Sequence, residues 1–333
     1  MSVTKGVSWS FLIRLLITLA GVGYLLGFKE WGDIFSAVKT AKVSWLIAAF
    51  LAYGITTALG MVRWKLLLDC CNSPVSWKRT AELTMVGIFA NSFMPGAMGG
   101  DLFKAVLATR YVPTGKTKIV MSILMERVLG FIAMFLVSTG LIINRFVPLT
   151  TEPATRLAVY LYFIAFLIVL LIVFLGAWKK VGQFIPFWNR LPFRKSLAEA
   201  GSAYQTFMHH QPTFWGGLGL SILAHFSLLL TCWFVSQALG LDLSFWDLGA
   251  VLPLIALVTL VLPSFGGLGV RELAFQHFLT FAAINKETSI ALSLIFYGVT
   301  LLWSILGGLV YLQYRGTVST IPEAEVEDAA KEV

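Results

Sequence analysis

Two interrupted apolar segments decide the fold, and their breaks read MPGAMGGD at residues 94–101 and LPSFGGLG at residues 262–269. Each break lies inside a longer apolar stretch, residues 80–109 and 246–284. Proline and paired glycines do not sustain a helix, so each stretch is predicted to form two short helical halves. Non-helical backbone at membrane depth is tolerated only where protein or a water-filled cavity covers it. Each break is therefore expected at the covered tip of a helical hairpin.

The composition indicates that lipid surrounds most of the chain. Of its 333 residues, 58% are hydrophobic and 13% are charged, and the mean hydropathy is +0.82. These values lie outside the range of soluble globular domains. Six other stretches are long enough to cross a hydrocarbon core of about 30 Å. They are residues 7–28, 43–62, 119–143, 155–177, 214–239 and 288–314. We predict one transmembrane domain over residues 1–318 and an acidic, disordered tail over residues 319–333.

The distribution of basic residues decides whether the two interrupted segments cross the membrane or turn back. Lys and Arg are enriched in the cytoplasmic loops of membrane proteins. If both segments crossed, an external loop would contain Lys179, Lys180, Arg190, Arg194 and Lys195. If both turn back, that loop and both termini are cytoplasmic. The sequence thus predicts two re-entrant hairpins, the first entering from the cytoplasm and the second from outside.

An internal repeat supports this layout. Each half of the chain carries two tryptophans 13 residues apart, then a proline and a Gly-Gly pair. These residues are Trp64, Trp77 and Pro95 in the first half, and Trp233, Trp246 and Pro263 in the second. Because the two units begin with spans of opposite direction, the repeat is predicted to be inverted, as in many transporters. The predicted fold class is an all-α integral membrane protein with six full transmembrane helices plus two re-entrant helical hairpins in an inverted repeat.

Ionisable side chains are costly at membrane depth, and here they fall in three places. These are Asp101 with Lys104, Glu126 with Arg127, and Arg271 with Glu272. A short helix that starts at a glycine break directs unpaired N–H groups and its positive dipole end toward the membrane interior, which favours an anion. The three basic residues are therefore candidates for holding a lipid phosphate headgroup, with the three carboxylates balancing the empty site. The alternative is that all six form internal salt bridges that lock the hairpins.

The residues at the hairpin tips allow two interpretations, close packing between helices or direct contact with the ligand. They are Pro95, Gly96, Gly99 and Gly100 in the first hairpin, and Pro263, Gly266, Gly267 and Gly269 in the second. Asn91 precedes the first break, where its amide can satisfy freed backbone groups or contact the headgroup.

Other classes of function are disfavoured. The four histidines form no cluster, and the three cysteines have no metal-ligand spacing, so neither a metal site nor a disulfide framework is predicted. The basic residues lie between apolar runs, which argues against a nucleic-acid partner. A phosphate-binding loop of the Walker type is absent from the sequence, and no cofactor is expected.

At these motifs the chain resembles the flippase-like transmembrane domain of lysylphosphatidylglycerol synthetases and their stand-alone relatives, over roughly residues 7–314. The first matching element comprises Asn91, Pro95, Gly96, Gly99, Gly100, Asp101 and Lys104, followed by Glu126 and Arg127. The second comprises Pro263, Gly266, Gly267, Gly269, Arg271 and Glu272. Lys104 stands where the family usually has Arg, which keeps the charge but loses bidentate binding of phosphate.

The resemblance implies a role in translocating or handling lipids. The synthetases carry a soluble aminoacyl-transfer domain after the membrane part, and the sequence ends at Val333 without one, so we expect a stand-alone member that transfers no amino acid. We predict a lipid flippase-like transporter, not an enzyme, for a phospholipid or polyprenyl-phosphate lipid in the cytoplasmic membrane of a bacterium or archaeon. One alternative is a secondary carrier of a small solute or ion. The other is a polyprenyl-phosphate-dependent enzyme, which the short external loop bearing Asp242 and Asp247 disfavours.

Overall fold

The structure is a computed structural model, and the part of the chain that it describes is helical apart from short turns. The described residues are 31–71, 73, 75–93, 99–110, 116–177, 207, 210–262, 264 and 267–318, together with residues 16, 19, 20 and 23. Residues 7–28, predicted as the first span, therefore lie almost entirely outside the described residues, as does the tail 319–333.

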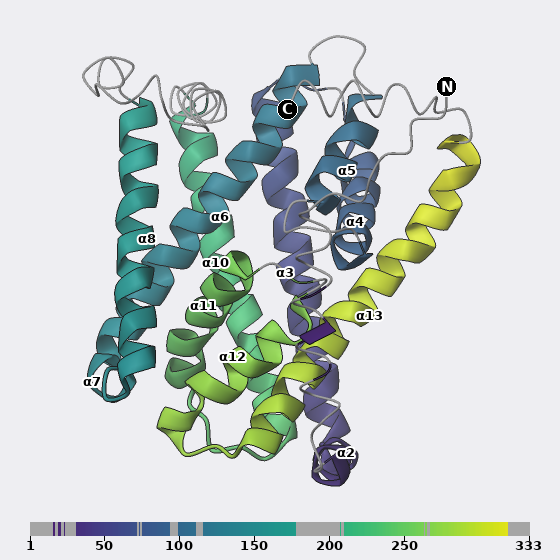
Figure 1. Ribbon diagram of the computed structural model, residues 1–333. Helices are drawn as coiled ribbons and strands as arrows, with labels where there is room; N and C mark the ends of the chain where they lie inside the picture. The colour runs from purple at the N-terminus through teal and green to yellow at the C-terminus, as the bar shows by residue number, and fades with distance from the viewer. Residues whose placement is uncertain are drawn as a thin grey trace, which may run out of the picture.

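Within this described part, five helices are long and apolar enough to cross a membrane (Figure 1). They are α3 (Val43–Cys70), α6 (Lys116–Asn144), α8 (Pro153–Ala177), α10 (Gln211–Ala238) and α13 (Lys286–Val318). Each corresponds to a predicted span. The largest difference is at α3, which continues eight residues past the predicted end at position 62 and so carries Arg63, Trp64 and Lys65 inside the helix.

The pattern of burial in α3 is the reverse of that in a soluble helix. Val43, Ile47, Leu51 and Ile55 are spaced four apart, so they share one helical face, and all four are exposed. In a bilayer such a face contacts lipid tails at no cost, so the apolar outside is stable there. The chain is thus a multi-pass membrane protein.

In the described part of the chain, the four helices that flank the two breaks are too short to cross. They are α4 (Trp77–Phe93), α5 (Gly99–Thr109), α11 (Phe245–Val261) and α12 (Val270–Phe278). At 1.5 Å per residue, the longest of them extends about 25 Å, less than the hydrocarbon thickness. The chain order places α4 and α5 on either side of the first break and α11 and α12 around the second. We call α4 with α5 the first short pair and α11 with α12 the second short pair.

The two short pairs lie toward opposite ends of the molecule (Figure 1). The first short pair occupies the upper part of the view and the second the lower part. Three further short elements lie at the lower end of the view: α2 (Trp31–Thr40), α7 (Phe146–Leu149) and the 3-10 turn Thr280–Ala282. Thr280–Ala282 lies within the stretch predicted as the second hairpin, residues 246–284, whereas no element was predicted for the other two segments.

The two halves of the chain interlock. We call α3 to α6 the first unit and α10 to α13 the second unit. Helix α13 packs on α4, while α6 packs on α11, so the last helix of each unit contacts the short pair of the other. Helices α3 and α10 run antiparallel: the Lys42 N–H donates to the Ala238 carbonyl at 2.9 Å, and the Ser227 hydroxyl donates to the Ala52 carbonyl at 2.7 Å. This reciprocal packing is what a twofold relation between the units would produce.

Candidate functional site

The first short pair is held close together at its glycines. A Cβ added to Gly100 would lie 2.3 Å from the carbonyl oxygen of Gly87 and 2.5 Å from Cγ of Asn91, so only glycine fits at this position. The backbone N–H of Gly100 donates to Oδ1 of Asn91 at 2.9 Å. Asn91 therefore satisfies one of the unpaired N–H groups at the start of α5. Close packing explains Gly100, and Asn91 is engaged with backbone.

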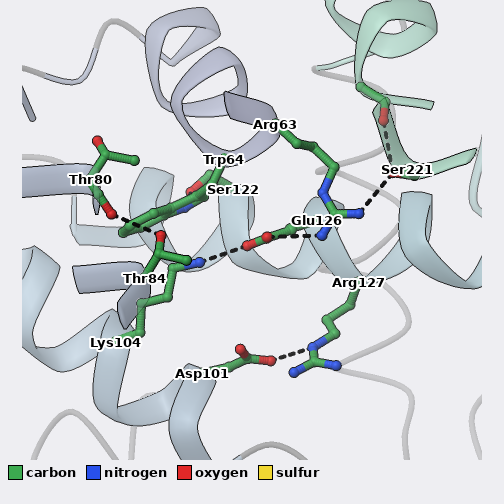
Figure 2. A network of polar contacts seen from close by, with 11 residues as sticks. Arg63, Trp64, Thr80, Thr84, Asp101, Lys104, Ser122, Glu126, Arg127 and Ser221 are labelled. Carbon is green, nitrogen blue, oxygen red and sulfur yellow. Dashed lines mark hydrogen bonds and ion pairs between the residues drawn. The ribbon is translucent and has the colours of Figure 1, made fainter. Parts of the chain in front are cut away.

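Glu126 is the centre of the charged cluster (Figure 2). Its Oε2 accepts from Nζ of Lys104 on α5 at 2.8 Å, and its Oε1 accepts from Nη2 of Arg63 on α3 at 3.0 Å. The Glu126 side chain is 12% exposed. One carboxylate on α6 thus ties the first short pair to α3 with two charge-assisted hydrogen bonds.

Lys104 is buried and has little freedom to reach a ligand. Besides its ion pair with Glu126, its Nζ lies 3.7 Å from the ring centroid of Trp64, a cation–π contact. The Trp64 ring is itself fixed, because its Nε1 donates to the Ser122 hydroxyl at 3.1 Å. We conclude that Lys104 anchors α5 against α3 and α6.

Arg127 is the most exposed cation of the cluster. It forms an ion pair with Asp101 through Nε, and its side chain is 39% exposed, against 14% for Asp101. In Figure 2 the Asp101 carboxylate meets the guanidinium at Nε, and no contact is marked at the two terminal nitrogens. Among the described residues, neither of these nitrogens has a hydrogen-bond partner. The amino groups of Arg127 are therefore available to an acceptor that is not part of the described chain.

The pairing differs from the one that the sequence suggested. Neighbours in sequence were expected to pair, Asp101 with Lys104 and Glu126 with Arg127, whereas the structure pairs Lys104 with Glu126 and Asp101 with Arg127. Consecutive helical residues point about 100° apart, so Glu126 and Arg127 face different neighbours. Sequence reasoning also missed Arg63, because a basic residue directly after an apolar run was counted as part of a loop. Its position immediately before Trp64 of the repeat was the available signal.

In the second short pair, the cation is enclosed by the protein. Arg271 donates from Nη2 to Oε1 of Glu272 at 2.5 Å and from Nε to the Ser293 hydroxyl at 3.1 Å, and its guanidinium carbon lies 4.1 Å from the ring centroid of Tyr297. Here the predicted neighbours, Arg271 and Glu272, do pair.

The start of α12 depends on two glycines and on Glu272. Gly267 and Gly269 have φ of +76° and +82°, the left-handed region that favours glycine. The fully buried Glu272 accepts the backbone N–H of Gly269 through Oε2 at 2.7 Å. Glu272 thus caps the helix and pairs with Arg271 at the same time.

The two short pairs each make one contact at the same sequence separation. Lys104 bonds the side chain of a residue 22 positions later, Glu126, and Arg271 bonds one 22 positions later, Ser293. Each contact joins the second short helix of a pair to the long helix that follows it. In the second unit the hydroxyl of Ser293 takes the place of the Glu126 carboxylate. The carboxylate that pairs with Arg271 belongs to Glu272, on the short helix itself.

The remaining predicted positions are placed only in part. Pro95, Gly96, Pro263 and Gly266 lie outside the described residues, and Gly99 is the first residue of α5. Within the described ranges, no group of three His, Cys, Asp or Glu side chains is arranged to hold a metal ion.

The fold and this cluster define a class of protein: a multi-pass helical membrane protein with charged residues gathered where short helices end inside the bundle. A family model described as the lysylphosphatidylglycerol synthase TM region matches residues 11–308. The chain belongs to this family, as its motifs suggested.

Three archaeal proteins described as UPF0104 membrane proteins are similar to parts of the chain. The Pyrococcus horikoshii protein is 28% identical over 36% of this chain and 37% of its own length. The Methanothermobacter thermautotrophicus protein is 31% identical over 29% and 28%, and the Archaeoglobus fulgidus protein is 27% identical over 45% and 48%. The chain thus spans less than half the length of each of these relatives.

Proposed function

We propose that the protein is a lipid transporter of the flippase type, which moves or handles a phospholipid or polyprenyl-phosphate lipid across the cytoplasmic membrane. The observation that carries this proposal is Arg127, a partly exposed guanidinium with two unused amino groups at the edge of the charged cluster. Planar guanidinium groups suit the oxygens of a phosphate. The proposal assigns no chemical step to the protein.

The charge of the cluster supports an anionic ligand. It contains three cations, Arg63, Lys104 and Arg127, and two carboxylates, Asp101 and Glu126, so one positive charge is left over. A surplus charge at membrane depth is costly unless a counter-ion neutralises it. A lipid phosphate beside Arg127 would supply that negative charge, and the N-terminal end of α5 with its positive dipole lies next to Asp101.

The proposed layout has six spans and two re-entrant pairs in an inverted repeat, with both termini in the cytoplasm. Its support is the length of the short helices and the reciprocal packing of α13 on α4 and α6 on α11. Transporters with such repeats place their substrate site near the membrane midplane, where broken helices end. We assign the cluster around Glu126 to the corresponding position in the first unit, because it includes Asp101 in the first turn of α5.

Lipid-dependent thermal stabilisation tests the proposal. The purified protein in detergent is titrated with phosphatidylglycerol, with phosphatidylcholine and with inorganic phosphate, and Tm is measured. Binding to the folded state raises Tm, so phosphatidylglycerol should stabilise the wild type most, and Arg127→Gln should lose most of that gain. Arg145→Gln is the matched control, because Arg145 is similarly exposed (34%) and pairs with Asp247 far from the cluster.

Three outcomes would count against the proposal. An equal loss in Arg145→Gln would mean that general surface charge attracts the lipid. A Tm gain from inorganic phosphate as large as that from lipid would favour the carrier of a small solute or ion. An unchanged gain in Arg127→Gln would remove Arg127 as the binding residue.

A further inference from the structure

Arg63 lies where three long helices meet. It belongs to α3, its Nη2 donates to Glu126 on α6 at 3.0 Å, and its Nη1 donates to the Ser221 hydroxyl on α10 at 2.9 Å (Figure 2). The buried Ser221 in turn donates to the Gly217 carbonyl of its own helix at 2.8 Å. Ser221 is therefore oriented with its oxygen toward Arg63, and Arg63 bridges the two units of the repeat.

The surroundings of Arg63 restrict the position of its guanidinium but do not satisfy all of its hydrogen-bond donors. A Cβ added to Gly130 of α6 would lie 3.8 Å from Nη1, an ordinary van der Waals distance, so α6 packs directly beside the guanidinium. The buried Nε has no hydrogen-bond partner in the described part of the chain. A buried donor without a partner destabilises the folded state. A site built for stability alone would be expected to satisfy it.

These contacts form one continuous chain of polar bonds. It runs from Lys104 on α5 through Glu126 on α6 and Arg63 on α3 to Ser221 on α10. Its first member anchors the first short pair, and its last belongs to the first helix of the second unit. The chain crosses the antiparallel contact between α3 and α10, where the first unit meets the second.

We propose that Arg63 is a positioning residue that couples the first short pair to α10. Because its guanidinium spans both partners, Glu126 keeps its orientation toward Lys104 only while α3 and α10 hold this register. A shift of α10 would withdraw Ser221, turn the guanidinium and release Glu126. That the coupling moves a lipid site rests on the proposed function. The coupling itself is a property of the folded chain.

The coupling is tested first without lipid. Lys104 and Ser221 do not contact each other, so the Tm losses of Lys104→Gln and Ser221→Ala should add unless Arg63 connects them. We expect the double variant to depart from additivity by about 2 °C or more. The departure from additivity should vanish when Arg63→Gln is added to the double variant. Arg63→Lys should have the same effect, because a single ammonium group cannot bond both partners as the guanidinium does. The lysine variant replaces the glutamine variant if the latter does not fold.

Ser227→Ala is the matched control. Ser227 is also a buried serine of α10 that bonds α3, through the Ala52 carbonyl, but it lies outside the chain of polar bonds. The Tm loss of Ser227→Ala should add to the Tm loss of Lys104→Gln. Additivity of Ser221→Ala with Lys104→Gln, or the same departure for Ser227→Ala, would overturn the coupling.

A second readout separates positioning from plain structural support. In vesicles of phosphatidylglycerol and phosphatidylcholine that contain a fluorescent phosphatidylglycerol, Ser221→Ala should slow the movement of the labelled lipid between leaflets by about fivefold or more. It should leave the lipid-induced gain in Tm unchanged, because Ser221 does not contact the site at Arg127. Equal rates for Ser221→Ala and Ser227→Ala would refute the positioning role. If the wild type shows neither lipid-induced stabilisation nor lipid movement, the proposed function fails, whereas the coupling is still decided by the additivity measurement.

Discussion

Lys104 binds the carboxylate of Glu126 on the next helix, 2.8 Å away, although Asp101 lies only three residues before it in α5. The bond leaves Asp101 to Arg127, and Glu126 takes Arg63 as its second partner. Two carboxylates are thus shared among three cations from three helices.

Removal of the central carboxylate should destabilise the protein more than removal of either of its partners. Glu126→Gln keeps the shape of the side chain but strands Arg63 and Lys104 with like charges at depth, a loss of about 3–5 kcal/mol in the free energy of unfolding. Lys104→Met removes a charge and leaves Glu126 paired with Arg63, so its loss should be smaller. Tm in detergent compares them. The double variant Glu126→Gln with Lys104→Met should recover part of the stability that Glu126→Gln loses. If it is less stable than both single variants, the pairing of Glu126 with Lys104 is contradicted.

The glycines of the two short pairs should respond differently to asparagine. Gly100 needs space, since Gly87 and Asn91 occupy the place of a Cβ. Gly267 needs a positive φ, and a Cβ there would make only ordinary van der Waals contacts. Asparagine tolerates the left-handed region better than alanine. Gly267→Asn should therefore be more stable than Gly267→Ala, while Gly100→Asn should be no better than Gly100→Ala. Gly60→Ala, which meets no atom within 4 Å, is the control and should be neutral or slightly stabilising.

Arg271 should act as a structural residue rather than as a lipid ligand. Its guanidinium is bonded to Glu272 and Ser293 and stacked on Tyr297, so Arg271→Gln would leave the buried Glu272 without its cation. We expect a Tm several degrees below that of the wild type, together with a normal lipid-induced gain. Arg127→Gln should show the opposite combination, a Tm near that of the wild type without lipid and a small lipid-induced gain. A lost gain in Arg271→Gln would restore Arg271 as a ligand residue.

The proposed topology predicts which cysteines react from each side. In a background with Cys70, Cys71 and Cys232 replaced by serine, a cysteine at Val147, which is 75% exposed on α7, should react with an impermeant maleimide added outside intact cells. A cysteine at Trp77, exposed at the start of α4, should react only after permeabilisation. Positive-inside orientation and a re-entrant first short pair both require this difference. External labelling at position 77 would exclude the proposed layout.

Much of the fold could be predicted because the relevant signals are local. Apolar runs of membrane length identified the five described spans, and the proline and glycine breaks divided the two remaining segments into short helices. The one predicted pair that the structure contains, Arg271 with Glu272, lies at a helix start where a capping carboxylate has few alternatives. The extension of α3 was missed because hydropathy falls at Arg63 although the helix continues.

The sequence by itself determined that the chain crosses a membrane, where its helices break, and that six charged residues lie within its apolar stretches. Only the tertiary structure decided which charges meet. Helical periodicity gives the direction of Glu126 and Arg127 along α6, but not which helices pack on either side. An ion pair depends on a separation of about 3–4 Å between atoms from different helices, and that separation is set by the packing of α3, α5, α6 and α10. Arg63 therefore became part of the site only when packing brought α10 against α3 and α6.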